Sequence, residues 1–293
     1  MKLYHYTKFD TFIYHILPKM ELRLGPLEGS NDPIEFSPTY ALDYNAFTQE
    51  HSEQIFEEFK ERLKQYKFLC FCMDTKLEGY KIPPMWAHYA ENHNGVCIEL
   101  DSSKLPKTIT SNEKYTGERV SYKNKIYFPP INSFFPIRNH NEETNEYIDR
   151  GVTCADNFFR GKHLFRKLPV WKYENEYRIV YKSSSNEEAF VDIKDAITTV
   201  YLGTRAAESQ KQKFEIVDFL LKAHKEKTGK EISLLIMKTN ISNDQLVFDK
   251  FDLKDYWERE EATKEIWRKY KETHPEQNIP EQYSTSNHTQ QAS

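Results

Sequence analysis

The sequence predicts an α+β fold in which helices flank a mostly antiparallel central sheet. Long helical patterns and short strand patterns both occur, and they lack the regular alternation of a doubly wound parallel sheet. No glycine-rich phosphate loop is present, which argues against a Rossmann or P-loop site. With 38% hydrophobic and 14% aromatic residues, the 293-residue chain has the composition of a folded globular protein.

In the first half of the chain, alternating hydrophobicity marks strands and a period near 3.6 residues marks helices. We expect helices at 8–17, 49–66 and 83–93, and strands at 3–7, within 21–36, and at 67–73, 96–101 and 118–122. Thr7 is placed to cap the first helix. The Pro, Asn and Phe content of 123–145 predicts a long loop of the kind that often covers a binding site.

In the second half, closely spaced strand patterns predict the centre of the sheet. These strands are at 176–182, 188–193 and 197–203, after a helix at 146–166 and before a helix at 207–224 and strands at 232–238 and 245–251. We therefore expect one domain over 1–252, a charged amphipathic helix over 253–275 and a disordered polar tail over 276–293.

Charge and hydropathy limit the classes of partner. The net charge is −4 and the isoelectric point is near 6.2, so no overall basic field draws the chain to nucleic acid. No apolar run is long enough to cross a membrane, and the start lacks the apolar core of a signal peptide, which predicts a cytoplasmic protein without membrane contact. Cys70 and Cys72 form a C-x-C on one strand face, which predicts buried thiols and no metal site.

Two polar motifs near the N-terminus are candidates for binding. His5 lies on the first predicted strand, and alternation points it away from Tyr4 and Tyr6. The alternative is a purely structural histidine. Asn31 and Asp32 precede a proline, a pattern that favours a turn and can also clamp a hydroxyl-rich ligand.

An aromatic helix supplies the next candidates. Trp86, His88 and Tyr89 share the predicted helix 83–93. A metal site there is disfavoured because the position four residues after His88 is Asn92. The helix forms either a stacked pocket for a flat ring or ordinary core packing.

Three charged residues alternate at the start of the predicted strand 176–182. Glu174, Glu176 and Arg178 would point the same way from a strand. Two carboxylates and a guanidinium on a buried face would indicate a function, since unpaired buried charge is costly. The alternative is a solvated edge strand on which the charges pair.

The order of these motifs carries a family resemblance. LYHYT, NDPIE, MWAHYAENHNGVCIELD and WKYENEYRIVY, over about residues 3–205, resemble the bacterial domain-of-unknown-function family 2971. A more distant resemblance is to NAD-dependent ADP-ribosyltransferases, which have a His-Tyr-Glu order. The paired Glu174 and Glu176 also look like the E-x-E of the arginine-type transferases, although their Ser-Thr-Ser strand is absent.

The second resemblance implies a function and roles for residues. It implies an NAD-using ADP-ribosyltransferase or NAD glycohydrolase of a bacterial toxin or antiviral defence system, with NAD as substrate and a nucleic acid or protein as acceptor. In it, His5 holds a ribose hydroxyl, Tyr89 or Trp86 stacks on nicotinamide, and Glu176 acts at the glycosidic carbon. The alternatives are a non-enzymatic ligand-sensing or partner-binding module and a nuclease-type hydrolase that uses His88 with the glutamate pair.

The sequence thus yields a set of candidate site residues. We expect Glu176 and His5 to be catalytic, and a nucleotide-like small-molecule ligand to be bound by Tyr6, Thr7, Asn31, Asp32, Trp86, His88, Tyr89, Glu174 and Arg178. Because one small-molecule site needs convergent polar groups, we expect His5, Tyr89 and Glu176 to line a single cleft together with Asn31 or Asp32. The transferase assignment requires His5 and Glu176 to lie on the same side of the sheet.

Overall fold

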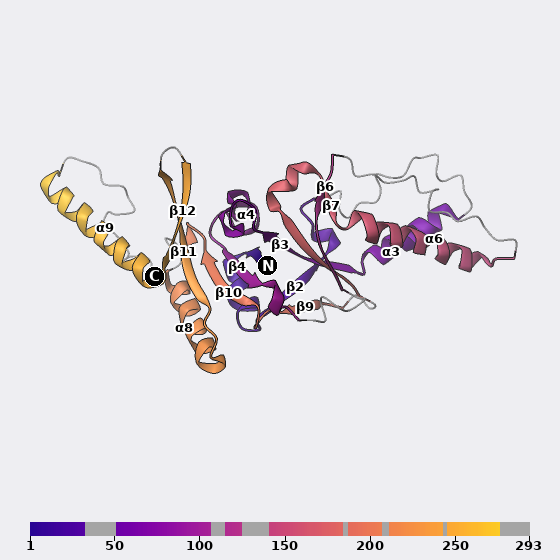
Figure 1. The fold of residues 1–293 in the computed structure, drawn as a ribbon, viewed down its shortest axis with the longest axis horizontal. Helices are drawn as coiled ribbons and strands as arrows, with labels where there is room; N and C mark the ends of the chain where they lie inside the picture. The colour runs from indigo at the N-terminus through magenta and orange to yellow at the C-terminus, as the bar shows by residue number, and fades with distance from the viewer. Residues whose placement is uncertain are drawn as a thin grey trace, which may run out of the picture.

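The structure, a computed structural model, describes residues 1–32, 51–106, 115–124, 141–183, 187–206, 211–242 and 245–275. Within these ranges a 10-stranded, mostly antiparallel sheet runs through the middle of the molecule, which confirms the α+β fold (Figure 1). Helices α3 (Ser52–Leu63) and α6 (Thr144–Phe158) extend from one end, and α8 (Lys211–Thr228) and α9 (Leu253–Thr273) lie at the other.

The strands of the long path follow an order unlike their order in the chain. In space they are β12 (Gln245–Asp252), β11 (Ser233–Ser242), β10 (Ile197–Leu202), β4 (Val96–Asp101), β1 (Lys2–Thr7), β3 (Tyr66–Met73), β2 (Glu21–Pro26) and β9 (Ala189–Asp192). Strand β8 (Glu176–Lys182) pairs with β3, and β5 (Tyr115–Arg119) pairs with β8. A separate parallel pair joins β6 (Ser121–Tyr122) to β7 (Arg166–Lys167).

Strand β3 changes partners along one of its edges. On one edge β8 pairs with it from Tyr66 to Cys72. On the other edge β1 pairs at Cys72 and Met73, whereas β2 pairs at Lys67 and Phe68. No strand of the described residues pairs with 69–71 on this second edge, so the sheet is open between β1 and β2.

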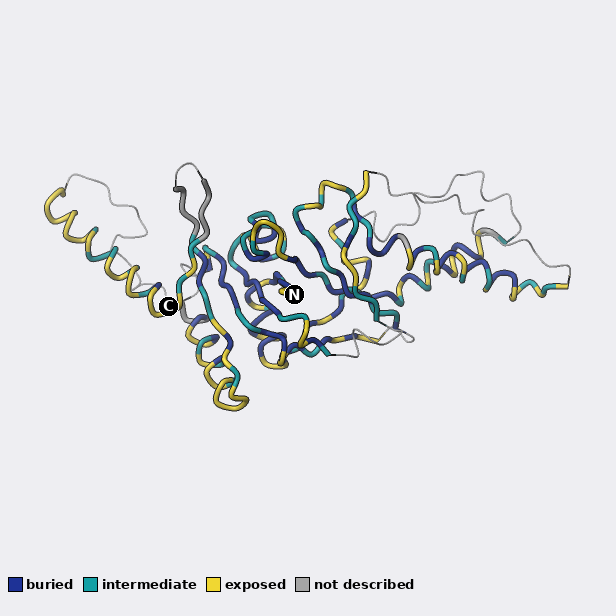
Figure 2. The backbone as a smooth tube through the Cα atoms, in the orientation of Figure 1, coloured by how far each residue is buried: buried dark blue, intermediate teal, exposed yellow. Residues whose placement is uncertain are grey.

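The core is divided among two sheet faces and a helical end (Figure 2). One face buries Leu3 and Phe71 under the first helical segment and α8, where Phe9 contacts Phe214 with ring centroids 5.5 Å apart. The opposite face packs against α4 (Pro83–Tyr89). The third cluster joins α3 and α6 to the start of β3. None of the helices in the described ranges is both long and apolar enough to cross a membrane.

Several helices differ from their predicted form. The first has only a short α-helical turn, α1 (Phe9–Thr11), before a π-helix over Phe12–Ile16. Its N-cap is Lys8, without a side-chain cap, so the prediction of a Thr7 cap is wrong. Helix α6 likewise continues as a π-helix over Phe159–His163. Short 3-10 helices cover Leu27–Gly29, Gly79–Lys81, Ser102–Lys104 and Pro169–Glu174.

Other boundaries and the centre of the sheet also differ. Helix α4 ends at Tyr89 rather than near 93, because Glu91, Asn92 and His93 have positive φ angles. The prediction that 176–182, 188–193 and 197–203 form the sheet centre is wrong, since β9 ends the path and β4, β1 and β3 lie inside it. Most of the loop predicted over 123–145 and the whole tail over 276–293 lie outside the described residues.

Gly95 tests the packing of α4 against β1. A Cβ atom there would lie 2.3 Å from the backbone oxygen of Thr7 and 2.8 Å from Ala90 Cα, so Gly95→Ala forces backbone to move. We expect it to lower the free energy of unfolding by about 2 kcal/mol or more in urea titrations. In Gly161→Ala, where nothing lies within 4 Å, stability should stay or rise by up to about 1 kcal/mol. Equal stability of the two variants would contradict this packing.

Candidate functional site

A cavity of about 520 Å³ lies at the opening between β1, β2 and β3, beside α4. This volume is within the range of small-molecule sites. Polar and charged side chains from segments far apart in the sequence line it: His5, Tyr6, Thr7, Lys8, Thr11, Arg23, Ser30, Asn31, His88, Tyr89, Lys167, Glu174 and Glu176. The cavity is therefore the place where most of the candidate motifs converge.

His5 reaches the cavity because the sheet is open. Its Nδ1 lies 3.1 Å from the carbonyl oxygen of Cys70, in the stretch of β3 that lacks a strand partner on this edge. Since a carbonyl oxygen only accepts, Nδ1 donates the hydrogen, and Nε2 of the neutral ring remains an acceptor. Burial lowers the pKa of His5, which keeps the ring neutral near pH 7.

Four charged side chains form a compact buried network. The Lys167 Nζ lies 2.7 Å from Glu174 Oε2 and 2.9 Å from Glu176 Oε2, so one ammonium group bridges two carboxylates. Arg178 donates from Nε to Glu176 Oε1 at 2.6 Å and from Nη2 to Glu176 Oε2 at 3.0 Å. All four residues are at most 5% exposed. The two positive charges balance the two carboxylates when both are ionised.

Neutral groups tie this network to its surroundings. Tyr89 donates its hydroxyl hydrogen to Glu174 Oε1 at 2.6 Å, which connects α4 to the network. Arg178 also donates from Nη1 to the carbonyl oxygen of Leu164 at 2.8 Å. Because β8 has a strand on each side and its charges are buried, the alternative of a solvated edge strand is wrong.

A left-handed residue separates the two carboxylates. Glu174 ends a 3-10 helix rather than lying on the strand, and Asn175 follows with φ 40° and ψ 54°. Asparagine tolerates this conformation better than most residues. Its Nδ2 also donates to the carbonyl oxygens of Met73 at 2.9 Å and Asp74 at 3.2 Å. Both carboxylates reach Lys167 across this junction between helix and strand.

The environment separates the pKa values of the two carboxyl groups. Burial acts to raise the pKa of Glu176, but the positive charges of Arg178 and Lys167 outweigh it and lower the pKa to about 2. Burial raises the pKa of Glu174, and the charge of Lys167 and the Tyr89 hydrogen bond only partly offset it. One group is thus firmly ionised while the other takes up a proton more easily. Such a separation is typical of acid–base pairs in active sites.

The structure brings most of the candidate residues together. His5, Tyr89, Glu176 and Asn31 all line the one cavity, as expected, and so do Tyr6, Thr7, His88 and Glu174. Alternation along β1 places His5 and Tyr4 on opposite faces of the sheet. Glu176 is aligned with Cys72, which is aligned with Tyr4, so Glu176 lies on the face opposite to His5. The expectation that His5 and Glu176 lie on one side of the sheet is therefore wrong. They share the cavity because it lies where the sheet is open. The roles assigned to these residues stay predictions.

Three candidate residues do not line the cavity. Trp86 is 1% exposed, donates from Nε1 to the carbonyl oxygen of Tyr80 at 2.7 Å and packs edge-on against Tyr6, so it belongs to the core. Asp32 is buried next to the lining residue Asn31. Arg178 contributes indirectly, by holding Glu176.

Sequence reasoning missed Lys167. Lys167 reaches the carboxylates because β7 pairs with β6 beside the start of β8. This pairing joins only two residues of each strand and has no hydrophobic pattern from which it could be predicted. Both cysteines of the C-x-C motif line the cavity. Cys72 is buried as expected, whereas Cys70 is only half-buried.

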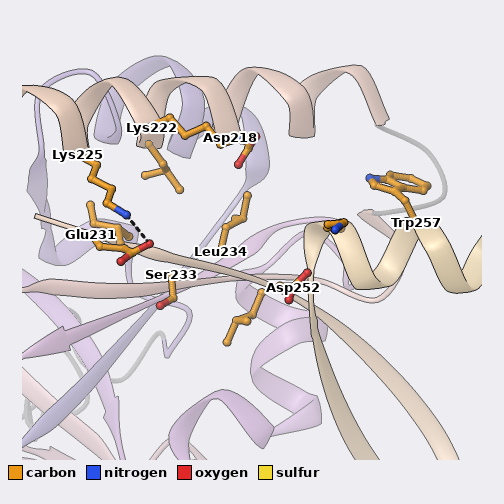
Figure 3. A pocket seen from close by; sticks show the side chains of 12 residues that line it. Asp218, Lys222, Lys225, Glu231, Ser233, Leu234, Asp252 and Trp257 are labelled. Atoms are coloured by element: carbon orange, nitrogen blue, oxygen red, sulfur yellow. Dashed lines mark hydrogen bonds and ion pairs between the residues drawn. The ribbon is translucent and has the colours of Figure 1, made fainter.

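A second cavity, of about 530 Å³, lies between α8, β11 and the start of α9 (Figure 3). Four of its charged side chains form two ion pairs: Lys225 contacts Glu231 at 2.9 Å, and Lys222 contacts Asp218 at 2.5 Å. These pairs are largely exposed to solvent, whereas the charged network at the first cavity is buried. The first cavity is therefore the candidate functional site.

Comparison with known proteins gives one match. The profile of the family described as "Protein of unknown function (DUF2971)" matches residues 85–179, from α4 to the start of β8. This match supports the resemblance to that family and includes the network residues Lys167, Glu174, Glu176 and Arg178. The searches of curated proteins and of solved structures gave no match.

Lys167→Met tests the network. The variant leaves two buried carboxylates with one cation, so we expect a loss of about 3 kcal/mol or more in the free energy of unfolding near pH 7. The loss should shrink as the pH falls from about 8 to about 5, because Glu174, whose pKa is already raised, then takes a proton and removes the excess charge. Denaturant titrations across this range measure it.

The exposed Lys172 provides the control in the same segment. Lys172→Met should change stability by less than about 0.5 kcal/mol at every pH. If both lysine variants were equally stable, or if the effect of Lys167→Met were independent of pH, the account of a charge-bridging lysine would be wrong.

Proposed function

We propose that the protein is an NAD-using enzyme that breaks the bond between nicotinamide and ribose, as an ADP-ribosyltransferase or NAD glycohydrolase. The observation that carries this proposal is the pair of carboxyl groups, Glu174 and Glu176, whose pKa values are driven in opposite directions at one cavity. A setting in a bacterial toxin or antiviral defence system rests on the sequence resemblance alone.

The lining of the cavity suits a nucleotide-like ligand. Hydroxyl and amide groups from Thr7, Thr11, Ser30 and Asn31 offer hydrogen bonds to ribose hydroxyls. The neutral His5 ring offers one further acceptor, from the face of the sheet opposite to Glu176. The ligand would therefore extend through the opening in the sheet, with its reacting bond on the Glu176 side.

The chemistry follows from the two carboxylates. As the C1′–N bond breaks, its electron pair stays on the nitrogen and nicotinamide leaves as a neutral ring. The ribose then carries positive charge, which the permanently ionised Glu176 stabilises. Glu174 accepts the proton from a water molecule or acceptor hydroxyl as its oxygen bonds to C1′, and later releases that proton to solvent.

A specific observation favours a second candidate, a binding module that leaves its ligand intact. Both oxygens of Glu176 are held by Arg178 and Lys167, and the residue is 2% exposed. If the protein is a binding module, the network of charges serves only to fix the walls of the cavity in place. A binding module would bind NAD or another nucleotide without releasing nicotinamide, so one assay separates the two.

Glu176→Gln provides the first test. The change keeps the shape of the side chain and removes the charge, so we expect nicotinamide release to fall by about 10²-fold or more, while NAD still binds in calorimetry. Glu118→Gln, at an exposed position on the neighbouring β5, is the matched control and should keep wild-type turnover. Melting temperatures of both variants report on folding.

The result for the wild-type chain decides between the candidates. NAD binding without nicotinamide release would overturn the enzyme and support the binding module. A folded Glu176→Gln chain with wild-type turnover would show that the charge of Glu176 has no catalytic role.

Tyr89→Phe tests Glu174 as the base. A base must be deprotonated to act, so turnover should rise with pH through the pKa of Glu174. The Tyr89 hydroxyl lowers that pKa, and its removal should therefore move the rising limb to higher pH while the rate recovers in alkaline solution. Tyr14→Phe, at an exposed tyrosine, should leave the profile in place. A loss of rate equal at every pH would rule out this role.

A further inference from the structure

Helix α9 projects from the end of the molecule opposite to α3 and α6 (Figure 1). Its first turns pack on the sheet: Tyr256 is 5% exposed, and Lys238 contacts Glu260 at 2.7 Å. Arg259 also lies over the ring of Phe251 at 4.7 Å. Beyond these turns the helix is largely exposed (Figure 2). The cavity at the opening of the sheet uses no residue of α9, so this helix is free for a different role.

The exposed part of α9 carries apolar side chains. Ile266 is 66% exposed and Tyr270 is 36% exposed, four residues apart and hence on one side of the helix. The small side chain of Ala262 is exposed one turn before Ile266, on that same side. Most of the stability of a helix in a protein comes from packing of its apolar face, so an exposed apolar face on a projecting helix indicates a surface that packs against something.

Charge is divided along the same helix. The stretch 253–262 has two basic and four acidic residues, a net charge of −2, whereas 263–273 has four basic and two acidic residues, a net charge of +2. A parallel alignment of two such helices would place like charges together. An antiparallel alignment places the acidic half of each copy against the basic half of the other copy.

We propose that α9 pairs antiparallel with α9 of a second copy of this chain. In a twofold arrangement, Ile266 of each copy packs on Ala262 of the other, where the small side chain admits the large one. With Ile266 opposite Ala262, the twofold axis passes close to the middle of α9, so the two helices overlap over nearly their whole length. The oppositely charged halves of the two copies then face each other. The pairing joins two molecules by their projecting ends and leaves the cavity of each copy open.

Sedimentation equilibrium of the full chain tests the pairing. The wild-type chain should show a monomer–dimer equilibrium that weakens with added salt. Two charge-reversal variants use exposed residues that flank the face of Ala262 and Ile266, E258K in the acidic half and K269E in the basic half. Each alone should dimerise about 10-fold more weakly or worse, because like charges then face each other.

Mixing the two variants distinguishes pairing from misfolding. The mixture restores opposite charges along both halves, so the heterodimer should form with near wild-type affinity. Phe219→Glu, on the exposed face of α8, is the control and should leave the equilibrium unchanged. A wild-type chain that stays monomeric would overturn the proposal and point to a different protein as the occupant. Dimerisation that survives both charge reversals, or no association on mixing, would also overturn it.

Discussion

The bridge from Lys167 to the two carboxylates is the interaction on which the site depends. It joins β7 to the end of a 3-10 helix and to the first residue of β8, and Tyr89 extends the network to α4. A buried charge network is stable only when its charges balance and its hydrogen bonds are satisfied. Two cations and two carboxylates meet that condition, and removing any one of them leaves an uncompensated charge in a buried site.

The second constraint is the opening in the sheet. On the edge of β3 away from β8, β1 pairs at one end and β2 at the other, and the backbone between them has no strand partner on that edge within the described residues. The His5 ring supplies a hydrogen to the carbonyl oxygen of Cys70 there. The opening lets groups from both faces of the sheet line one cavity, which an unbroken sheet would prevent.

Local patterns predicted the fold class, most strands and the convergence of His5, Asn31, Tyr89 and Glu176. They failed where tertiary pairing decides the outcome. The place of β9 at the end of the path depends on its pairing with β2 far away in the sequence. Lys167 is drawn to the network by the short β6–β7 pair, which has no pattern of its own. Trp86 was assigned to the site because an indole ring can either stack on a ligand or pack in a core. Only the structure distinguishes the two roles, since it shows that Trp86 is 1% exposed.

The central claim is that a nucleotide-like ligand occupies the cavity at the opening of the sheet. Hydrogen–deuterium exchange with and without NAD tests it most directly, because it locates a bound ligand whether or not catalysis occurs. The account predicts slower exchange on ligand addition in the segments that line the cavity, around residues 4–11, 23–31 and 85–89. Unchanged exchange in all three, or protection confined to α8 and α9, would contradict it.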